Sequence, residues 1–331
     1  MQKPCTDGRF AYILKHMHTL SHRRRALTAM SIAMAAAAFS APLHKLALEA
    51  GMPAVTLSML RMAITALIIT PITLARGDTR IGLRAVSRRD FLLSLLSGAM
   101  LAAHFSCWAL SLTMTDAFAA TTLCNMNVAF SVVGSILLFR EFVVRRAWPG
   151  LIMALAGATL LSMGGFGAGA SGSLRGNLVA LLSGAAMSGY YLCGREVRKR
   201  LSMACYTAIV YCACAAALVA LTLILGQRVF GFPPIAYLAA AGLSLICTFA
   251  GHSMQSYAIR DLGATTLSVA MLSEAITGPL LVWAILGQAA PERSLPGGAL
   301  IIAGILVYTL ASSRRGRTGT DAIASDQSNA P

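Results

Sequence analysis

The chain has 331 residues, of which 57 % are hydrophobic and 12 % charged, and its formal net charge is +15. Soluble domains carry about 25 % charged residues, and a chain with so few could not cover its surface in water. The composition therefore excludes an ordinary soluble domain and predicts a polytopic membrane protein. The cations form short clusters between apolar runs instead of one basic face, which is typical of membrane loops and argues against nucleic-acid binding.

Ten apolar runs approach the length of about 20 residues that a helix needs to cross a bilayer. They lie at 27–48, 54–75, 91–112, 117–139, 147–166, 174–194, 204–225, 234–257, 262–286 and 295–312. The runs lack the period-two alternation of barrel strands, so we predict an all-α membrane protein with ten transmembrane helices. Residues 1–26 and 313–331 are polar and are predicted to form tails, the second one disordered.

Lysine and arginine residues predict the orientation of these helices. With the N-terminus inside, most cations fall in inner segments, including Arg23–Arg25, Arg88–Arg89 and Arg145–Arg146. The outer segments hold Lys45, Arg175, Arg228 and Arg293. By the positive-inside rule, we expect a multi-pass protein of a bacterial-type inner (plasma) membrane with both termini in the cytoplasm.

The two halves of the chain repeat. The stretch WPGLIMALAGATLL (148–161) parallels LPGGALIIAGILVY (295–308). An offset of 147 residues relates Pro149 to Pro296, Gly150 to Gly297, Gly157 to Gly304, Asn127 to Glu274, and Glu141 to Gln288. With one residue of slippage, His104 also parallels His252. Because each half has an odd number of spans, the sequence predicts two inverted five-helix repeats, 27–166 and 174–312, an arrangement used for alternating access.

This ordered, duplicated set of residues resembles the drug/metabolite transporter superfamily, EamA type. In that family each copy has a helix that runs into a Gly-Glu turn and is followed by a Gly-x6-Gly helix. The corresponding turns here are Phe139-Arg140-Glu141 and Gly287-Gln288, the second without its acid. The family often has Glu-Pro in its ninth helix, where this chain has Glu274-Ala275, and Arg61 matches an arginine common in the second helix. The resemblance covers about residues 27–312 and implies a ten-helix transporter of small organic solutes, often an exporter, without a cofactor.

Glu274 lies 12 residues into the run 262–286, which at about 1.5 Å per residue is close to mid-bilayer. An acid at that depth costs roughly 2.5–3.5 kcal/mol if it faces lipid. We therefore expect Glu274 to face the bundle interior, where it would carry a proton or bind a cationic substrate group. The alternative is a structural acid that is hydrogen-bonded to neighbouring helices.

Other polar residues inside the runs are also candidates. Arg61 could bind a substrate carboxylate, pair with Glu274, or extend to the outer headgroups. His104 and His252 could relay a proton, or hydrogen-bond a neighbouring helix. Asn125 and Asn127 could bind a substrate amine or carboxylate, or hold helices together.

Among the aromatic residues, Trp108 and Tyr190 are the stronger candidates for lining a cavity. We interpret Tyr191, Tyr257 and Trp283 as interfacial anchors, since aromatic residues near span ends more often have that role. The eight cysteines are scattered and form no CxxC pair, so no metal site or disulfide framework is expected.

These features predict an inner-membrane transporter, in the first place an exporter, that moves a small polar or amphipathic metabolite by alternating access. Proton coupling through Glu274 is a hypothesis. The alternatives are an uptake permease of the same fold, a non-transporting membrane protein, or a membrane enzyme, which would need a nucleophile–base pair or a ligand cluster that the sequence lacks. The expected partners are a small-molecule substrate and the lipid bilayer, and a homodimer stays open.

Overall fold

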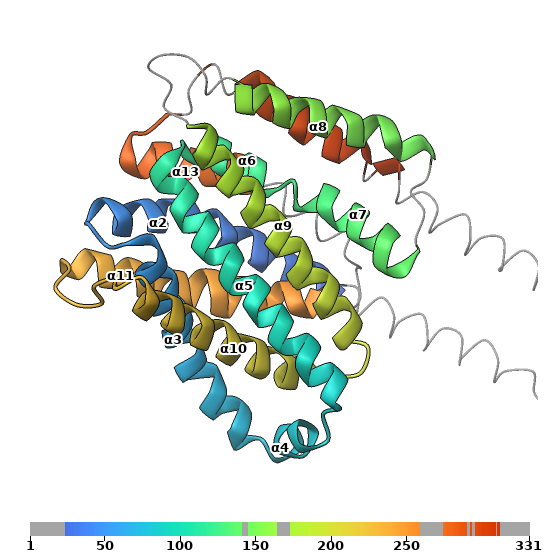
Figure 1. Cartoon of the computed structure of the whole chain (residues 1–331), viewed down its shortest axis with the longest axis vertical. Helices are drawn as coiled ribbons and strands as arrows, with labels where there is room; N and C mark the ends of the chain where they lie inside the picture. Colours follow the sequence, from blue (N-terminus) through green and yellow to red (C-terminus); the bar gives the residue numbers. More distant parts are fainter. Residues whose placement is uncertain are drawn as a thin grey trace, which may run out of the picture.

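The computed structural model describes residues 24–140, 145–163, 173–258, 274–289, 292, 295–308 and 310–311. Within these ranges the regular structure is helical and contains no strand, which confirms the predicted class (Figure 1). In the described ranges, six helices are long and apolar enough to span a membrane: Arg24–Glu49, Ala54–Ala75, Arg88–Met114, Ala117–Phe139, Met203–Ile224 and Pro234–Ala258. Each of them coincides, within a few residues, with a predicted run.

The described elements are all helical and follow one another along the chain. The helix that starts at Arg24 continues into α2 (Ser40–Glu49) and is followed by α3 (Ala54–Ala75), α4 (Gly77–Arg84), α5 (Arg88–Met114), α6 (Ala117–Cys124) and α7 (Asn127–Phe139). After the short 3-10 helix η1 (Arg145–Ala147) come α8 (Trp148–Met163), α9 (Leu174–Val197) and α10 (Met203–Ile224). The second half continues with α11 (Pro234–Gly242), the π-helix η3 (Leu243–His252), α13 (Glu274–Leu286) and the helix Leu295–Tyr308.

Side chains that precede the helices explain several of these starting points. Ser87 accepts a hydrogen bond from the backbone N–H of Asp90 at 3.1 Å, and Asp116 accepts one from Ala119 at 2.8 Å. Ser173 and Ser202 cap α9 and α10 in the same way. Each cap satisfies an N–H group that the first helical turn leaves without a partner.

The short helix α4 was not predicted, because its eight residues fall below the length at which apolar runs are recognised. Asp78 lies in its first turn and Arg84 in its last turn, so both charges complement the helix dipole. α4 packs against α3 and α10 at one end of the bundle.

The end of the bundle at which α5 begins and α9 ends is rich in arginine, and we call it the cationic end. There Arg200 contacts the Asp90 carboxylate at 2.7 Å and the Glu196 carboxylate at 3.0 Å, which joins the start of α5 to the end of α9. These hydrogen bonds, first of all that of Asp90, raise the pKa of the Arg200 guanidinium. At the opposite end, Ser173 donates to the carbonyl of Met114, and Gln288 donates to Glu49 at 2.6 Å.

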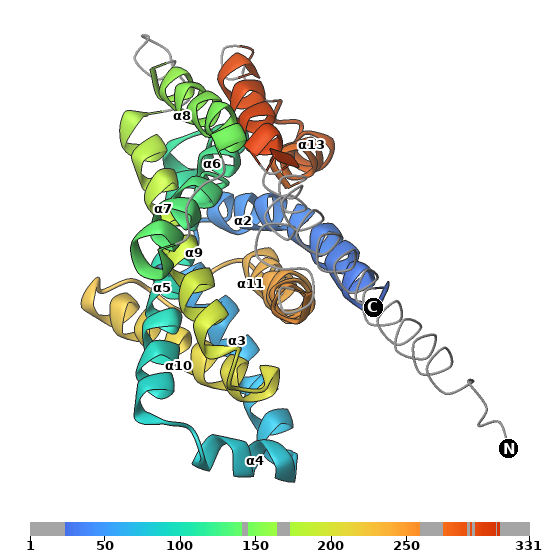
Figure 2. The same cartoon turned by 90° about the vertical axis from the view of Figure 1, so that its right-hand side faces the viewer.

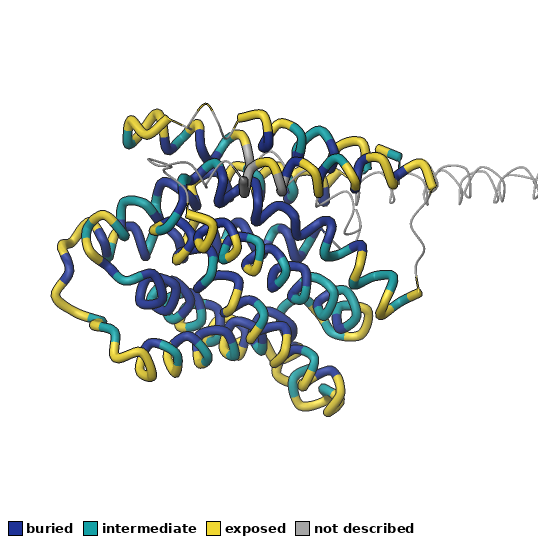
Figure 3. The backbone as a smooth tube through the Cα atoms, turned by 45° about the horizontal axis from the view of Figure 1, so that its top comes forward, coloured by how far each residue is buried: buried dark blue, intermediate teal, exposed yellow. Residues whose placement is uncertain are grey.

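Burial is distributed as a lipid environment requires. Large apolar side chains are exposed on the outside of the bundle, with Leu137 at 75 % and Ile224 at 80 %. Polar side chains such as Arg61, Thr65 and Ser97 are buried in the interior, and buried positions follow the inward sides of the helices (Figure 3). A soluble protein would be destabilised by so many exposed apolar residues, whereas a bilayer accommodates them.

The last helix of each half, α8 and Leu295–Tyr308, lie side by side in both views (Figures 1 and 2). A Cβ atom added at Gly157 would lie 2.8 Å from the carbonyl oxygen of Gly297, and one added at Gly150 would lie 2.5 Å from that of Gly304. The contact is therefore antiparallel. Gly157 meets Gly297, which is the repeat equivalent of Gly150, and Gly150 meets Gly304, which is the repeat equivalent of Gly157. Such a reciprocal contact is the signature of a two-fold axis, and only glycine allows the backbones to approach so closely.

The helices α7 and α13 also correspond, since their bounds differ by 147 residues at both ends. α7 ends at the cationic end, where the guanidinium of Arg195 lies 4.8 Å from the Phe139 ring centroid. α13 ends at the opposite end, beside Glu49. The two equivalent helices therefore run from the middle of the bundle in opposite directions.

Candidate functional site

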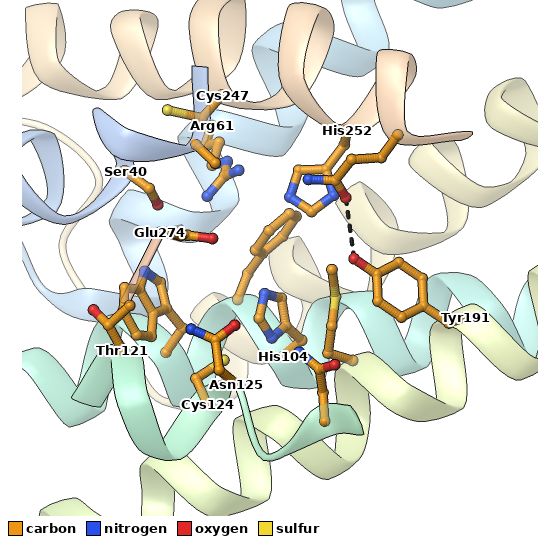
Figure 4. A pocket seen from close by; sticks show the side chains of 16 residues that line it. Ser40, Arg61, His104, Thr121, Cys124, Asn125, Tyr191, Cys247, His252 and Glu274 are labelled. Atoms are coloured by element: carbon orange, nitrogen blue, oxygen red, sulfur yellow. Dashed lines mark hydrogen bonds between the residues drawn. The ribbon is translucent and has the colours of Figure 1, made fainter. Parts of the chain in front are cut away.

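A cavity lies in the middle of the bundle, between α2, α3, α5, α6, α7, α9, η3 and α13 (Figure 4). It has room for a few water molecules. Seven of the predicted site residues line it: Glu274, Asn127, Arg61, His104, His252, Asn125 and Trp108. The structure thus brings together side chains from both repeats.

Arg61 is the cation in the wall of this cavity, and it is only 2 % exposed. Its Nε donates to Thr248 Oγ1 at 2.6 Å, and its guanidinium carbon lies 3.9 Å from the centroid of the Phe105 ring. Burial excludes the alternative in which Arg61 extends to the headgroups. Among the described residues, no carboxylate lies within the 4.0 Å of an ion pair with Arg61.

The π-helix η3 positions the residues that face Arg61. Its wider turn brings Cys247, Thr248 and His252 to the cavity side, and Thr65 on α3 is linked to Ser244 on η3 at 2.8 Å. π-helical turns are uncommon and often occur at functional sites. The Nδ1 atom of His252 is buried and has no hydrogen-bond partner within the described residues.

His104 on α5 is held by Ser183 on α9. Its Nδ1 lies 3.1 Å from the carbonyl oxygen of Ser183, and the Ser183 hydroxyl donates back to the carbonyl of His104 at 3.1 Å. The Ser183 hydroxyl also lies 2.9 Å from Nδ1. A carbonyl oxygen can only accept, which favours the tautomer with the proton on Nδ1. In the neutral ring the other nitrogen, Nε2, is then an acceptor.

The asparagines lie where the fourth predicted span bends. α6 ends at Cys124 and α7 begins at Asn127, with Asn125 and Met126 in the turn between them. α9 approaches this turn closely, since a Cβ atom added at Gly184 would lie 2.5 Å from the carbonyl oxygen of Cys124. Asn127 is 7 % exposed, and within the described part of the chain its Oδ1 has no hydrogen-bond partner.

Tyr190 does not line the cavity, although it was predicted to. Its hydroxyl contacts that of Ser256 at 3.3 Å, and its ring lies 6.5 Å from the ring of His252. Its neighbour Tyr191, interpreted above as an interfacial anchor, lines the cavity instead and donates to Gln255 at 3.1 Å. Adjacent helical positions point about 100° apart, and hydropathy alone does not reveal which of them faces inward.

Further lining residues were missed by the sequence analysis. They are Ser40, Thr121, Cys124, Cys247, Met187 and Gln255, together with Ala37 and Phe105. Small polar and apolar residues are common in membrane helices, so none of these carries a signal by itself. The repeat offset of 147 residues does reveal some of them, because it relates Trp108 to Gln255, His252 to Phe105 and Ser40 to Met187, and all of these line the cavity.

Different side chains lie at the two ends of the cavity. Towards the cationic end, Tyr191 and Gln255 separate it from a smaller pocket lined by Tyr190, Arg195 and Arg198. Towards the opposite end, a buried apolar layer covers it, made of Ala41, Trp108, Leu112, Ala117, Ala120 and Val282. Beyond this layer lies an outer pocket that includes Lys45 and Asp116, and burial raises the pKa of Asp116.

A helical membrane bundle with a cavity between two repeats that is lined by charged and polar side chains has the architecture of a secondary transporter. The sequence matches the EamA-like transporter family over residues 24–163 and 174–310. The chain therefore belongs to this family, which confirms the resemblance, and it is a membrane transporter and not an enzyme.

Structural comparison agrees with this assignment at the level of the fold. A solved crystal structure of a protein is similar to the chain with a TM-score of 0.60 at 21 % sequence identity, covering 87 % of this chain and 98 % of the other. No curated protein matches the chain.

Proposed function

We propose that this chain is an inner-membrane transporter that exports a small polar or amphipathic organic metabolite by alternating access around the central cavity. The observation that carries the proposal is the convergence of Arg61, Glu274, Asn127 and the two histidines on one cavity. Polar and charged side chains are expensive inside a membrane and mark substrate or ion pathways. Export is the direction that the family resemblance implies.

The proposed architecture is ten transmembrane helices in two inverted five-helix repeats. The reciprocal contact of Gly150 and Gly157 with Gly304 and Gly297 supports it, as do the opposite directions of α7 and α13. In such a transporter one repeat rocks against the other, so the shared cavity opens to one side at a time. The cationic end is proposed to face the cytoplasm, together with both termini.

Transport is tested with purified protein in sealed vesicles that are loaded with a mixture of metabolites. Loss of individual solutes from vesicles containing the protein, but not from protein-free vesicles, is the expected result. Vesicles that retain every solute, in either orientation of the protein and with or without a proton gradient, would contradict the proposal. Uptake with no release in cells would favour the permease alternative.

Proton coupling is proposed to depend on Glu274, which is the acid among the residues that line the cavity. A carboxylate that alternately binds a proton and a substrate group couples their movements. The Glu274→Gln variant keeps the shape of the side chain but cannot release a proton. We expect flux in this variant to fall at least about tenfold and to stop responding to an imposed pH gradient.

Glu292, which is exposed, provides the control for this experiment. The Glu292→Gln variant removes one acid as well, but from a loop outside the cavity, and should retain the flux and pH response of the parent protein. Full flux with unchanged pH dependence in Glu274→Gln would rule out coupling through this residue.

A further inference from the structure

The short helix α4 and its two flanks carry a row of arginines that lies apart from the central cavity. Arg76, Arg80, Arg84 and Arg88 follow one another at intervals of four residues, and we call them the arginine row. Arg76 precedes α4, Arg80 and Arg84 lie on it, and Arg88 begins α5. All four are exposed. Because positions four apart share one face of a helix, the guanidinium groups on α4 are neighbours on its surface.

Contacts on the other side of α4 decide which way this row faces. Thr79 is buried, and a Cβ atom added at Gly82 would lie 2.9 Å from the sulfur of Cys205 on α10. These two positions therefore turn towards the bundle. Arg80 and Arg84, which are exposed, turn away from it. The packing of α4 thus presents its basic side to the surroundings of the protein.

The arginine row lies where the lipid-facing surface of α3 ends. Leu74, near the last residue of α3, is exposed, and its carbonyl accepts a hydrogen bond from Arg80 Nε at 2.9 Å. On α4 itself, Ile81 is 72 % exposed. α4 lies at the lower end of the bundle in both views (Figures 1 and 2). Exposed apolar side chains next to guanidinium groups match the boundary between the acyl chains and the headgroups of a bilayer.

The positive charge of this surface is not neutralised within the described part of the chain. Asp90 contacts the guanidinium of Arg200 at 2.7 Å, and Glu196 contacts the same guanidinium at 3.0 Å. Among the described residues, no carboxylate lies within 4.0 Å of the arginine row. In the stretch 76–88 the sequence has one acid, Asp78, against four arginines. The row therefore offers net positive charge and free N–H donors to an anionic partner.

We propose that the arginine row is a binding surface for anionic phospholipids. The guanidinium groups contact the headgroup phosphates, to which each can donate two parallel hydrogen bonds, and Ile81 inserts between the upper parts of the acyl chains. Clusters of about four to eight basic residues next to a membrane span or on an amphipathic helix bind anionic lipids. Because the row lies outside the central cavity, its lipid partner is independent of the solute that is transported.

The test measures lipid binding to the full-length purified protein in detergent micelles. Phosphatidylglycerol, which is anionic, and phosphatidylcholine with the same acyl chains, which has no net charge, are titrated separately, and bound lipid is counted by native mass spectrometry. Each basic residue at an anionic lipid surface strengthens binding about fivefold. We therefore expect phosphatidylglycerol to bind at least about tenfold more tightly than phosphatidylcholine, and this preference to decrease as salt is added.

Paired substitutions at exposed positions connect this preference to α4. The double variant Arg80→Gln, Arg84→Gln should lose most of the preference, by about tenfold or more, with little change in the binding of phosphatidylcholine. Arg80→Lys, Arg84→Lys retains the two charges and should retain most of the preference. The matched control is Arg145→Gln, Arg146→Gln, which removes the same charge from exposed positions of η1 and should bind both lipids like the parent protein.

Equal binding of the two lipids by the parent protein would overturn the proposal. An equal loss of preference in both double glutamine variants would do so as well, because total charge and not the arginine row would then govern binding. Glycerophosphate, which is the soluble headgroup without acyl chains, separates the two sources of phosphate. It should not displace phosphatidylglycerol at equal concentration, and displacement would indicate a site for a soluble phosphate compound instead of a lipid surface.

Discussion

At the residue scale, Arg61 shows how a membrane interior can hold a permanent charge. Its guanidinium is fixed by Thr248 on one side and by the face of the Phe105 ring on the other. A cation over an aromatic ring contributes about 2 kcal/mol when both are desolvated. These contacts hold the guanidinium in one orientation, so the edge presented to the cavity is preorganised.

The Thr248→Val variant tests this arrangement. It keeps the size of the side chain but leaves the Arg61 Nε without an acceptor, so we expect the free energy of unfolding to fall by about 1–3 kcal/mol. Thr222→Val is the control, because Thr222 is equally buried and donates only to the carbonyl of Leu218 in its own helix. A decrease of the same size in both variants, measured by denaturation in detergent, would show that Thr248 has no special role at Arg61.

At the element scale, the ends of α7 and α13 show the repeat in detail. Each helix is followed by a residue in the left-handed region, Arg140 with φ of 55° and Gly287 with φ of 67°. Glycine adopts this conformation freely, whereas another residue is destabilised by about 1–2 kcal/mol. The first repeat has kept the backbone conformation of the turn although it lacks the glycine.

Reciprocal substitutions are therefore expected to have opposite effects. Arg140→Gly should raise the free energy of unfolding by about 0.5–1 kcal/mol. Glycine removes the strain of the left-handed conformation at this position, and its greater conformational freedom in the unfolded chain offsets part of that stabilisation. Gly287→Ala should lower it by about 1 kcal/mol, and no atom lies within 4 Å of the added Cβ to confuse the result. Thermal denaturation in one detergent measures both variants, and changes of the same sign would contradict the proposed equivalence.

At the scale of the whole molecule, the asymmetry of charge between the two ends predicts the orientation in the membrane. Arg145 and Arg228 are both exposed, and they belong to segments assigned to opposite sides. In an Arg228→Cys variant, a membrane-impermeant maleimide should label the new cysteine in intact cells. In Arg145→Cys it should do so only after permeabilisation. The parent protein gives the background of the native cysteines, and labelling of both new positions from one side would refute the topology.

Much of the fold could be predicted because lipid simplifies the problem. Inside a bilayer the backbone must satisfy its own hydrogen bonds, and a helix does so within a single segment. An apolar run of about 20 residues therefore predicts a helix. The predicted run 54–75 has the same bounds as α3. The short helix α4 lies outside the apolar runs and was therefore not predicted. The structure describes the predicted run 262–286 only from Glu274 onwards.

The candidate site was predictable only in part. Glu274, Arg61, His104 and the asparagines stood out because polar groups in apolar runs are expensive and therefore conspicuous. Tyr190 and Tyr191 could not be distinguished, because adjacent residues on a helix have the same depth and differ only in direction. Gln255 and Ser183 act through partners on other helices, and those partners are defined only by packing.

The sequence by itself determined the membrane environment, the positions of most helices and the duplication, because hydropathy and a constant offset are properties of the linear chain. Only the tertiary structure decided that Arg61 is buried against Phe105 and Thr248, that His104 Nδ1 contacts Ser183, and that Tyr191 replaces Tyr190 in the cavity wall. These features depend on the rotation of each helix about its axis. That rotation is set by close contacts such as the one between Gly184 and Cys124, and no single helix encodes it.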